Sequence, residues 1–232
     1  MSDSEDVRLA VFDFGGTLIH DTADVAAIFK AALAQHGLEV DDGRLVALRG
    51  AAKREAIARL AAGSEADPER IYATFRELLV AAFAGQGVRT IDGVEQALDR
   101  LRKRGLRLAL TTGFDRVVTE WLLARLPWAT SIDAVVCADE VAVGRPAPYM
   151  VFRAMEKTRI EDVRQVATVG DTDNDLMAGQ RAGVGTHVGV LSGAHDRARL
   201  EKVPHTVLLG SAAELPDWLE RNAGAEKKKA RR

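Results

Sequence analysis

The hydrophobic pattern of this sequence changes twice along the chain. Residues 9–12 form a short apolar run that ends at Asp13 and a glycine pair, as a buried strand followed by a tight turn does. After residue 88, segments with helical periodicity alternate with short apolar runs. The pattern there predicts helices at 92–104, 115–126, 148–157 and 174–182, and strands at 106–110, 132–136, 166–169 and 186–190. Such alternation is typical of a parallel sheet covered by helices on both faces.

Residues 19–88 have helical periodicity alone and no convincing strand. Thr22 is a candidate N-cap for a helix that ends at Gly37, residues 50–62 predict a short helix, and Asp67-Pro68 predicts the start of another. We therefore expect an α/β, doubly wound parallel-sheet core (1–18 and 89–222) that is interrupted after its first strand by an all-helical cap (19–88). Residues 223–232, rich in lysine, predict a disordered basic tail.

Composition narrows the function classes. The chain has 232 residues, 47% of them hydrophobic, and a net charge of −2, which favours neither nucleic acid nor a membrane as a partner. The single cysteine, Cys137, excludes an internal disulfide and is typical of a reducing compartment. The N-terminus has no apolar targeting core, so we expect a cytoplasmic protein.

Polar residues follow the predicted strands where ligands bind in open parallel sheets, beyond the carboxyl ends. Asp13, Thr112 and Asp171 each follow a strand, and Arg145 lies in the loop after another. Each has an ordinary alternative, as a helix cap, a turn residue or a surface charge. Four such residues in order at strand ends favour a common site.

The chemistry of these four residues is compatible with phosphoryl transfer. A carboxylate is a competent nucleophile toward phosphorus, so Asp13 is the candidate nucleophile. Two close carboxylates need a cation between them, and Mg²⁺ suits a site with few protein ligands. The expected metal ligands are Asp13, the Gly15 carbonyl, Asp171 and Asp175. Asp173 is a further candidate, and it and Asp175 either ligate the metal directly or orient metal-bound water.

The same strand ends and loops also carry hydrogen-bond donors that can stabilise charge on a phosphoryl group. Thr112 and Arg145 are expected to bind the transferring phosphoryl oxygens. The backbone amides of Gly16 and Thr17 are expected to assist, and Gly113 is a further candidate for substrate binding.

These segments resemble the motifs of the haloacid dehalogenase superfamily. Residues 13–18 (DFGGTL) resemble its first motif, Thr112 its second, Arg145 its third and residues 170–175 (GDTDND) its acidic fourth. The resemblance runs from about residue 8 to 219. It implies a Rossmann-like core with an inserted helical cap, a Mg²⁺ cofactor and an aspartyl-phosphate intermediate.

Finer features are similar to the phosphonatase branch, the phosphonoacetaldehyde hydrolases and their relatives. These are TTGF at 111–114, GRPAPYM at 144–150, GVLSGAH at 189–195 and PHT at 204–206. The cation of motif three is Arg145, as in that branch, where most of the superfamily has lysine. Caps of this branch pair with a neighbouring copy, so a homodimer is one expectation.

Gly15 departs from the motif of the ordinary phosphatases. They have an aspartate there that protonates the leaving group and activates water, and a glycine can do neither. Phosphonatases also lack this aspartate and use a cap lysine that forms a Schiff base with the substrate. Lys53, in the segment GAAKREAI, is at the position of that lysine. His20, at the entrance to the cap, is a weaker candidate for the missing acid–base group.

The surroundings of Lys53 leave its role open. Phosphonoacetaldehyde hydrolases have a methionine and a histidine where this chain has Arg49 and Ala56. Lys53 is therefore a candidate either for the Schiff base or for contact with a phosphate or carboxylate. Arg49 favours a substrate with an additional negative group, such as phosphonopyruvate.

The candidate site residues are compatible with three functions. The first is a hydrolase of small phosphonates that breaks a C–P bond. The second is a phosphatase for activated substrates, such as a sugar 1-phosphate or an acyl phosphate, which tolerate Gly15. The third is a non-catalytic domain that binds a phosphorylated ligand or a partner. Retention of Asp13 argues against the third, because a binding domain needs no nucleophile.

Overall fold

The computed structural model describes residues 7–20, 24–46 and 51–229. Six parallel strands form one sheet in the order β3-β2-β1-β4-β5-β6. Their bounds are Leu9–Phe12 (β1), Arg107–Thr112 (β2), Ala134–Cys137 (β3), Val166–Gly170 (β4), Thr186–Val190 (β5) and Val207–Leu209 (β6). The prediction of an α/β fold with a parallel sheet is confirmed. The sequence pattern missed β6, whose three residues are too few to give a periodic signal.

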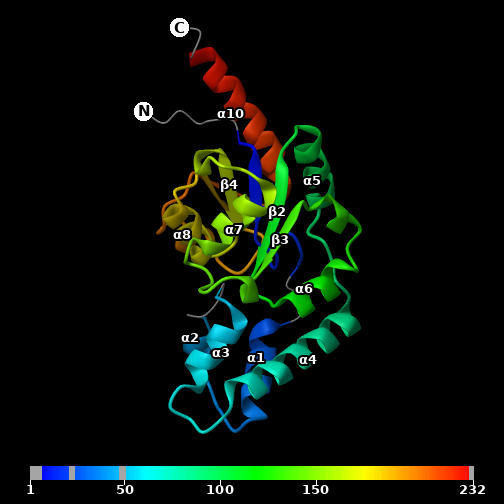
Figure 1. Ribbon diagram of the computed structural model, residues 1–232, viewed down its shortest axis with the longest axis vertical. Helices are drawn as coiled ribbons and strands as arrows, with labels where there is room; N and C mark the ends of the chain where they lie inside the picture. Colours follow the sequence, from blue (N-terminus) through cyan, green and yellow to red (C-terminus); the bar gives the residue numbers. More distant parts are fainter. Residues whose placement is uncertain (1–6, 21–23, 47–50, 230–232) are drawn as a thin grey trace.

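Helices cover both faces of the sheet (Figure 1). Their bounds are Val94–Lys103 (α5), Arg116–Leu123 (α6), Tyr149–Thr158 (α7), Asp173–Ala182 (α8), Arg197–Leu200 (α9) and Leu215–Lys229 (α10). Side chains alternate across β1: Leu9 and Val11 pack with residues of α7, while Ala10 and Phe12 pack with residues of α5 and α6. The central strands are therefore buried on both faces, which explains their continuous apolar runs.

The strand order reverses beside β1. The chain runs outward from β1 through β2 to β3, then returns to β4 on the other side of β1. Connections leave the sheet in opposite directions at this point and open a crevice at the carboxyl ends of β1 and β4. The residues directly after these two strands are Asp13 and Asp171.

In the described parts of the segment between β1 and α5 lie four helices: α1 (Val25–Ala34), α2 (Asp42–Val46), α3 (Lys53–Ala61) and α4 (Pro68–Gln86). We call them the helical insert. They share a core in which the rings of Phe29 and Phe75 lie 4.6 Å apart. Figure 1 shows the insert beyond one end of the sheet, on the side of α6. The N-cap of α1 is Asp24, whose carboxylate accepts a hydrogen bond from the Ala27 N–H, and Thr22 lies outside the described residues.

The C-terminal segment differs from the expectation of disorder after residue 222. The structure continues α10 to Lys229. Alanine, glutamate and lysine, which dominate this segment, are all good helix formers, and buried Leu215 and Leu219 anchor the first turns of the helix to the core. Charge alone was therefore a poor guide here. Across the described ranges, we find no helix with the length and apolar character needed to cross a membrane.

Candidate active site

Three carboxylates meet at the crevice beside β1. One oxygen each of Asp13, Asp171 and Asp175 lies within 4.8 Å of the others, and all three residues are buried. The backbone fixes this arrangement, because the Asp13 N–H donates a 2.8 Å hydrogen bond to the carbonyl of Val169 and so extends the β1–β4 pairing. The sequence expectation that these three aspartates lie together agrees with this geometry.

Asp175 is held by the first turn of α8. Thr172 is the N-cap, and its backbone N–H and hydroxyl donate to Asp175 Oδ2 at 3.0 and 2.5 Å. The Asp175 N–H donates in return to the Thr172 hydroxyl at 3.4 Å, and this reciprocal capping box fixes the carboxylate and satisfies amides that have no partner within the helix. The other oxygen, Oδ1, accepts a hydrogen bond from Arg145.

Arg145 links two of the aspartates. Its Nη1 atom lies 2.5 Å from Asp13 Oδ1 and also contacts Asp175, and its side chain is only 6% exposed. One guanidinium and three carboxylates give this buried group a formal charge of −2. Burying net charge without a counter-ion is costly, so the donor set fits a divalent cation.

Asp171 is the most deeply buried of the three carboxylates. The Thr17 hydroxyl donates to its Oδ1 at 3.3 Å and the Ala194 N–H to its Oδ2 at 2.6 Å. Burial, followed by the nearby charge of Asp13, raises the pKa of Asp171 to about 7. A cation beside it would favour the ionised form.

Gly16 permits this packing. Its φ is +76°, and a Cβ there would lie 2.5 Å from Asp171 Oδ2. The Gly16 carbonyl also accepts a 2.7 Å hydrogen bond from Ser192, which the sequence analysis did not assign to the site. At Gly15, in contrast, a Cβ would have no neighbour within 4 Å. The space for a side chain exists at position 15, but the sequence leaves it empty.

Thr112 ends β2 beside the acidic group. It is buried, and its hydroxyl accepts a 3.2 Å hydrogen bond from the Phe114 N–H. The hydroxyl hydrogen therefore remains available for an anionic ligand. Gly113 follows, and its carbonyl accepts a hydrogen bond from the insert.

The start of α3 packs against two loops of the core. The Lys53 N–H donates to the Gly113 carbonyl at 3.0 Å, and the Gly144 N–H donates to Glu55 at 3.1 Å. A Cβ at Gly113 would lie 2.8 Å from the Ala51 carbonyl oxygen, and one at Gly144 would lie 2.9 Å from Ala52 Cβ. Glycines at 113 and 144 therefore allow the insert to approach the loops that carry Thr112 and Arg145. The sequence analysis missed Glu55, because nothing in a lone helix glutamate indicates such a long-range contact.

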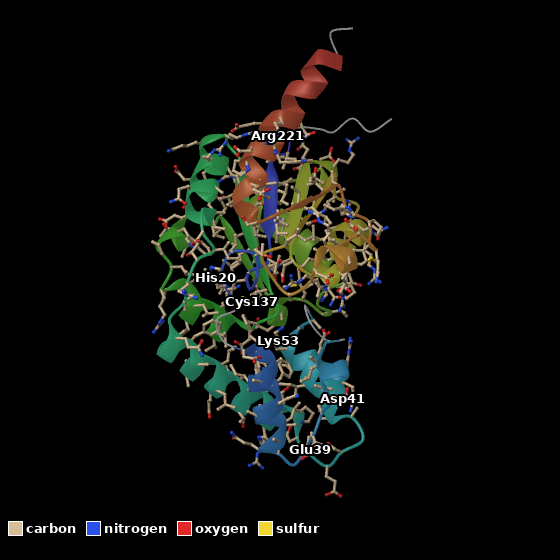
Figure 2. The ribbon with its side chains drawn as sticks, turned by 180° about the vertical axis from the view of Figure 1, so that it is seen from behind. His20, Glu39, Asp41, Lys53, Cys137 and Arg221 are labelled. Atoms are coloured by element: carbon tan, nitrogen blue, oxygen red, sulfur yellow. The ribbon has the colours of Figure 1, made fainter. Side chains whose placement is uncertain are left out.

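Lys53 is half-buried at this junction. Figure 2 shows it at the end of the insert that faces the core. Its Nζ atom lies 3.5 Å from the Ala51 carbonyl and 5.8 Å from the centre of the Phe114 ring. Arg49, the other cap candidate, lies outside the described residues.

The remaining candidates have structural partners. The Asp173 carboxylate accepts a 2.7 Å hydrogen bond from the Arg199 guanidinium, and its backbone N–H donates to His195 Nδ1. His20 pairs through its backbone with Arg89. Burial raises the pKa of the Cys137 thiol to about 11, so this cysteine is neutral at physiological pH.

The structure thus combines a doubly wound parallel sheet with a buried acidic group at its switch point, the place where α/β proteins bind ligands. Residues 10–188 match the haloacid dehalogenase-like hydrolases, and the chain belongs to this family. It is therefore a hydrolase, and the resemblance noted in the sequence is confirmed.

The relatives of this chain include proteins named as phosphonatases and as phosphatases. A phosphonoacetaldehyde hydrolase of Nitratidesulfovibrio vulgaris is 31% identical over 209 residues, covering 82% of this chain and 73% of its own. A phosphoglycolate phosphatase of Agrobacterium fabrum is 30% identical over 219 residues, covering 92% and 93%. A crystal structure of a phosphonoacetaldehyde hydrolase-like protein from Oleispira antarctica has a TM-score of 0.79 at 22% identity, covering 94% of this chain and 93% of that one. The chain is thus similar to both phosphonatases and phosphatases.

Proposed function

We propose that this chain is a Mg²⁺-dependent hydrolase of small phosphonates, which cleaves a C–P bond by phosphoryl transfer to Asp13. The observation that carries the proposal is the 3.0 Å hydrogen bond from the backbone N–H of Lys53 to the carbonyl of Gly113. This bond places the start of α3 beside the residue that follows Thr112, in a site that has glycine at position 15. Such a site lacks the usual acid–base carboxylate, and the Lys53 amine lies at the junction of insert and core, 5.8 Å from the centre of the Phe114 ring. The name of the Nitratidesulfovibrio vulgaris relative supports this assignment.

The metal would be held by Asp13, Asp171 and Asp175, with the Gly15 carbonyl as a further ligand. Their close approach, with a formal charge of −2 after Arg145 is counted, fits a divalent cation. Mg²⁺ supplies charge neutralisation and orientation of phosphoryl oxygens when bound. The side chains of the site carry out the phosphoryl transfer itself.

The proposed transfer begins with attack of an Asp13 oxygen on phosphorus. The P–C bond breaks as the new O–P bond forms, and its electron pair leaves with the carbon fragment. Arg145 and the Thr112 hydroxyl stabilise the charge on the phosphoryl oxygens, with the Thr17 and Gly113 amides as further donors. The Gly16 N–H, which the sequence also offered, already donates a 2.8 Å hydrogen bond to the Ile19 carbonyl. Water then cleaves the aspartyl-phosphate, releasing phosphate and restoring the carboxylate.

Lys53 would make the carbon fragment a competent leaving group. Its amine condenses with the substrate carbonyl and releases water, and the iminium accepts the electron pair of the broken bond to give an enamine. Protonation at carbon and hydrolysis then restore the lysine. Arg49, four residues earlier, would bind an additional carboxylate on the substrate. Without the condensation step, Lys53 would serve only as a cationic contact for the substrate.

A second candidate is hydrolysis of an activated phosphate, such as an acyl phosphate or a sugar 1-phosphate. The observation that favours it is Gly15, because good leaving groups need no protonation. The similarity to a phosphoglycolate phosphatase also supports phosphate-ester chemistry on this scaffold. A non-catalytic binding role is the least supported, because Asp13, Thr112 and Arg145 are all retained and buried together.

The test is Mg²⁺-dependent phosphate release from phosphonoacetaldehyde, phosphonopyruvate, an acyl phosphate, a sugar 1-phosphate and an alkyl phosphate. We expect turnover of a phosphonate that is lost in both Asp13→Asn and Lys53→Arg, and is unchanged in Lys103→Arg, a control on the exposed face of α5. Borohydride should trap the iminium and add the reduced carbon fragment to Lys53. Turnover of activated phosphates alone, surviving Lys53→Arg, would instead establish the second candidate.

Two wider expectations remain predictions. A cytoplasmic location rests on the single cysteine of the chain, Cys137, which is a free thiol, as is typical of a reducing compartment. A homodimer rests on the resemblance to the phosphonatase branch, and light scattering of the purified chain would test it.

A further inference from the structure

A cavity lies at the opposite end of the sheet from the aspartates. It has a volume of about 440 Å³ and is formed where β1 and β2 begin and where α5 and α7 end. Its lining is Arg8, Arg102, Gly105, Leu106, Arg107, Asp133, Thr158, Arg159 and Ile160. In Figure 1 the start of β1 lies at the end of the core that faces away from the helical insert. Cavities of this volume accommodate small organic ligands.

The lining is strongly cationic. It contains four arginines from four separate segments and one acid, Asp133, which gives a formal charge of +3. Asp133 accepts hydrogen bonds from Arg107 at 2.9 Å, from Arg102 at 3.3 Å and from the Leu108 N–H at 2.9 Å. This carboxylate therefore fixes the orientation of two guanidiniums at the cavity wall.

The other two arginines, Arg8 and Arg159, have no such partner. Within residues 7–20, 24–46 and 51–229, neither side chain forms an ion pair or a hydrogen bond. A guanidinium offers five donors in a planar fork that matches phosphate and carboxylate oxygens. Among the described residues, the cavity thus presents two guanidinium groups without a protein partner, beside two whose orientation Asp133 fixes.

The backbone conformation of Arg159 also indicates a role for its side chain. Arg159 ends α7 with a φ of +57°, and it has the only positive φ among the described non-glycine residues. Helices that end in this conformation favour glycine, because a Cβ is crowded there. Arginine has no conformational advantage over glycine at this position, so its presence indicates that the side chain makes a contact.

We propose that this cavity binds a compact phosphorylated anion. Two or three negative charges on the ligand would match the +3 lining, and bidentate contacts from Arg8 and Arg159 would provide most of the affinity. The carbonyl ends of α5 and α7 also point to this region and would repel an anion, so the ligand must contact the guanidiniums rather than the helix ends.

This site is separate from the proposed active site. Strand β2 begins at Arg107 in the cavity wall and ends at Thr112 beside the aspartates. Five steps of about 3.3 Å along a strand separate the two residues by roughly 17 Å. A ligand in the cavity is therefore a second molecule, and its binding depends on neither Asp13 nor a metal.

The test is calorimetric titration of the full chain with inorganic pyrophosphate in EDTA, which keeps metal out of the aspartate site. We expect one equivalent to bind, with affinity that falls as sodium chloride is raised from 20 to 200 mM, because exposed charges are screened. Arg8→Gln and Arg159→Gly should each weaken binding about tenfold. Arg159→Gly should not lower the unfolding temperature, because glycine relieves the positive φ, so loss of binding cannot be assigned to misfolding.

The matched control is Arg153→Gln, which removes one positive charge from the same helix at an exposed site paired with Glu156. It should leave pyrophosphate affinity within twofold. The proposal is overturned if the unaltered chain does not bind at low salt, or if all three variants weaken binding equally. Binding that appears only after Asp3, Glu5 and Asp6 are changed to amides would also overturn it, because the carboxylates of the chain itself would then exclude an added anion.

Discussion

The carboxylate of Glu55 accepts a 3.1 Å hydrogen bond from the backbone N–H of Gly144, the residue that precedes Arg145. A side chain of the helical insert therefore holds the loop that carries the buried guanidinium. Since Arg145 contacts both Asp13 and Asp175, the position of the insert and the geometry of the acidic group are physically connected.

Replacing Glu55 should thus impair catalysis more than stability. Loss of a charge-assisted hydrogen bond, about 1.5 kcal/mol, predicts a drop of about tenfold in kcat/KM for Glu55→Ala. A fall in kcat at constant KM would indicate an effect through Arg145, whereas a rise in KM would indicate looser docking of the insert. Glu69→Ala, on α4 and paired with Arg54, is the control. Equal losses in the two variants would contradict the role of Glu55.

Adding a side chain at Gly113 should push the insert away. The new Cβ of Gly113→Ala would lie 2.8 Å from a backbone oxygen of Ala51, a distance that neither chain segment can accommodate without moving. We expect kcat/KM to fall by about tenfold to a hundredfold, as displaced groups near a reacting centre do. Gly85→Ala, inside α4 with open space around it, should keep full activity and gain up to about 1 kcal/mol of stability. Normal activity in Gly113→Ala would show that close docking is dispensable.

Gly15→Asp should create a general phosphatase. A Cβ at position 15 meets nothing within 4 Å, so the substitution fits, and the new carboxyl group can protonate an alkoxide leaving group. General acid–base catalysis predicts a gain of about a hundredfold in hydrolysis of a simple alkyl phosphate. Gly15→Ala, measured in parallel, should give no gain. Equal activity of the two variants would mean that leaving-group protonation does not limit this site.

Asp13→Asn should remove turnover while preserving the fold. The amide is nearly isosteric but cannot form an acyl phosphate, so phosphate release should fall by at least about a thousandfold. Asp139→Asn, outside the acidic group, is the matched control. Retention of more than a few per cent of the activity in Asp13→Asn would identify a different nucleophile.

Asp133 should stabilise the fold in a pH-dependent way. Burial alone would raise its pKa, but hydrogen bonds from Leu108 and Arg107, together with the charges of Arg102 and Arg107, lower it below the ordinary value. A lowered pKa in the folded state means that the stabilisation is fully present above the unfolded-state pKa of about 4 and disappears as the pH falls through the folded-state pKa.

Urea unfolding of Asp133→Asn should therefore show a loss of about 1–3 kcal/mol at pH 7. The difference from the unaltered chain should narrow as the pH drops below about 4. Asp99→Asn, on the exposed face of α5, should change stability by less than about 0.5 kcal/mol at either pH. A loss in Asp133→Asn that does not change with pH would contradict the ionic origin of the stabilisation.

The sequence by itself determined the class of fold and the main residues of the acidic group. Apolar runs of four to six residues between amphipathic helices specify buried parallel strands, and strand ends in such a sheet share one edge. The proximity of Asp13 and Asp171 follows from that rule, without knowledge of any long-range contact. Local signals also located Asp67 and Pro68 at the start of α4, because capping is decided within one turn.

Only the tertiary structure decided how the insert meets the core. The contacts of Glu55 with Gly144 and of Lys53 with Gly113 join residues far apart in sequence, and neither leaves a periodic or local signal. The same is true of the basic cavity, where Arg8, Arg107 and Arg159 read as separate surface charges until the sheet and α7 bring them together. The C-terminal helix shows the reverse: its lysine-rich composition predicted disorder, but anchoring of its first turns and the helix propensity of its residues favour continued helix.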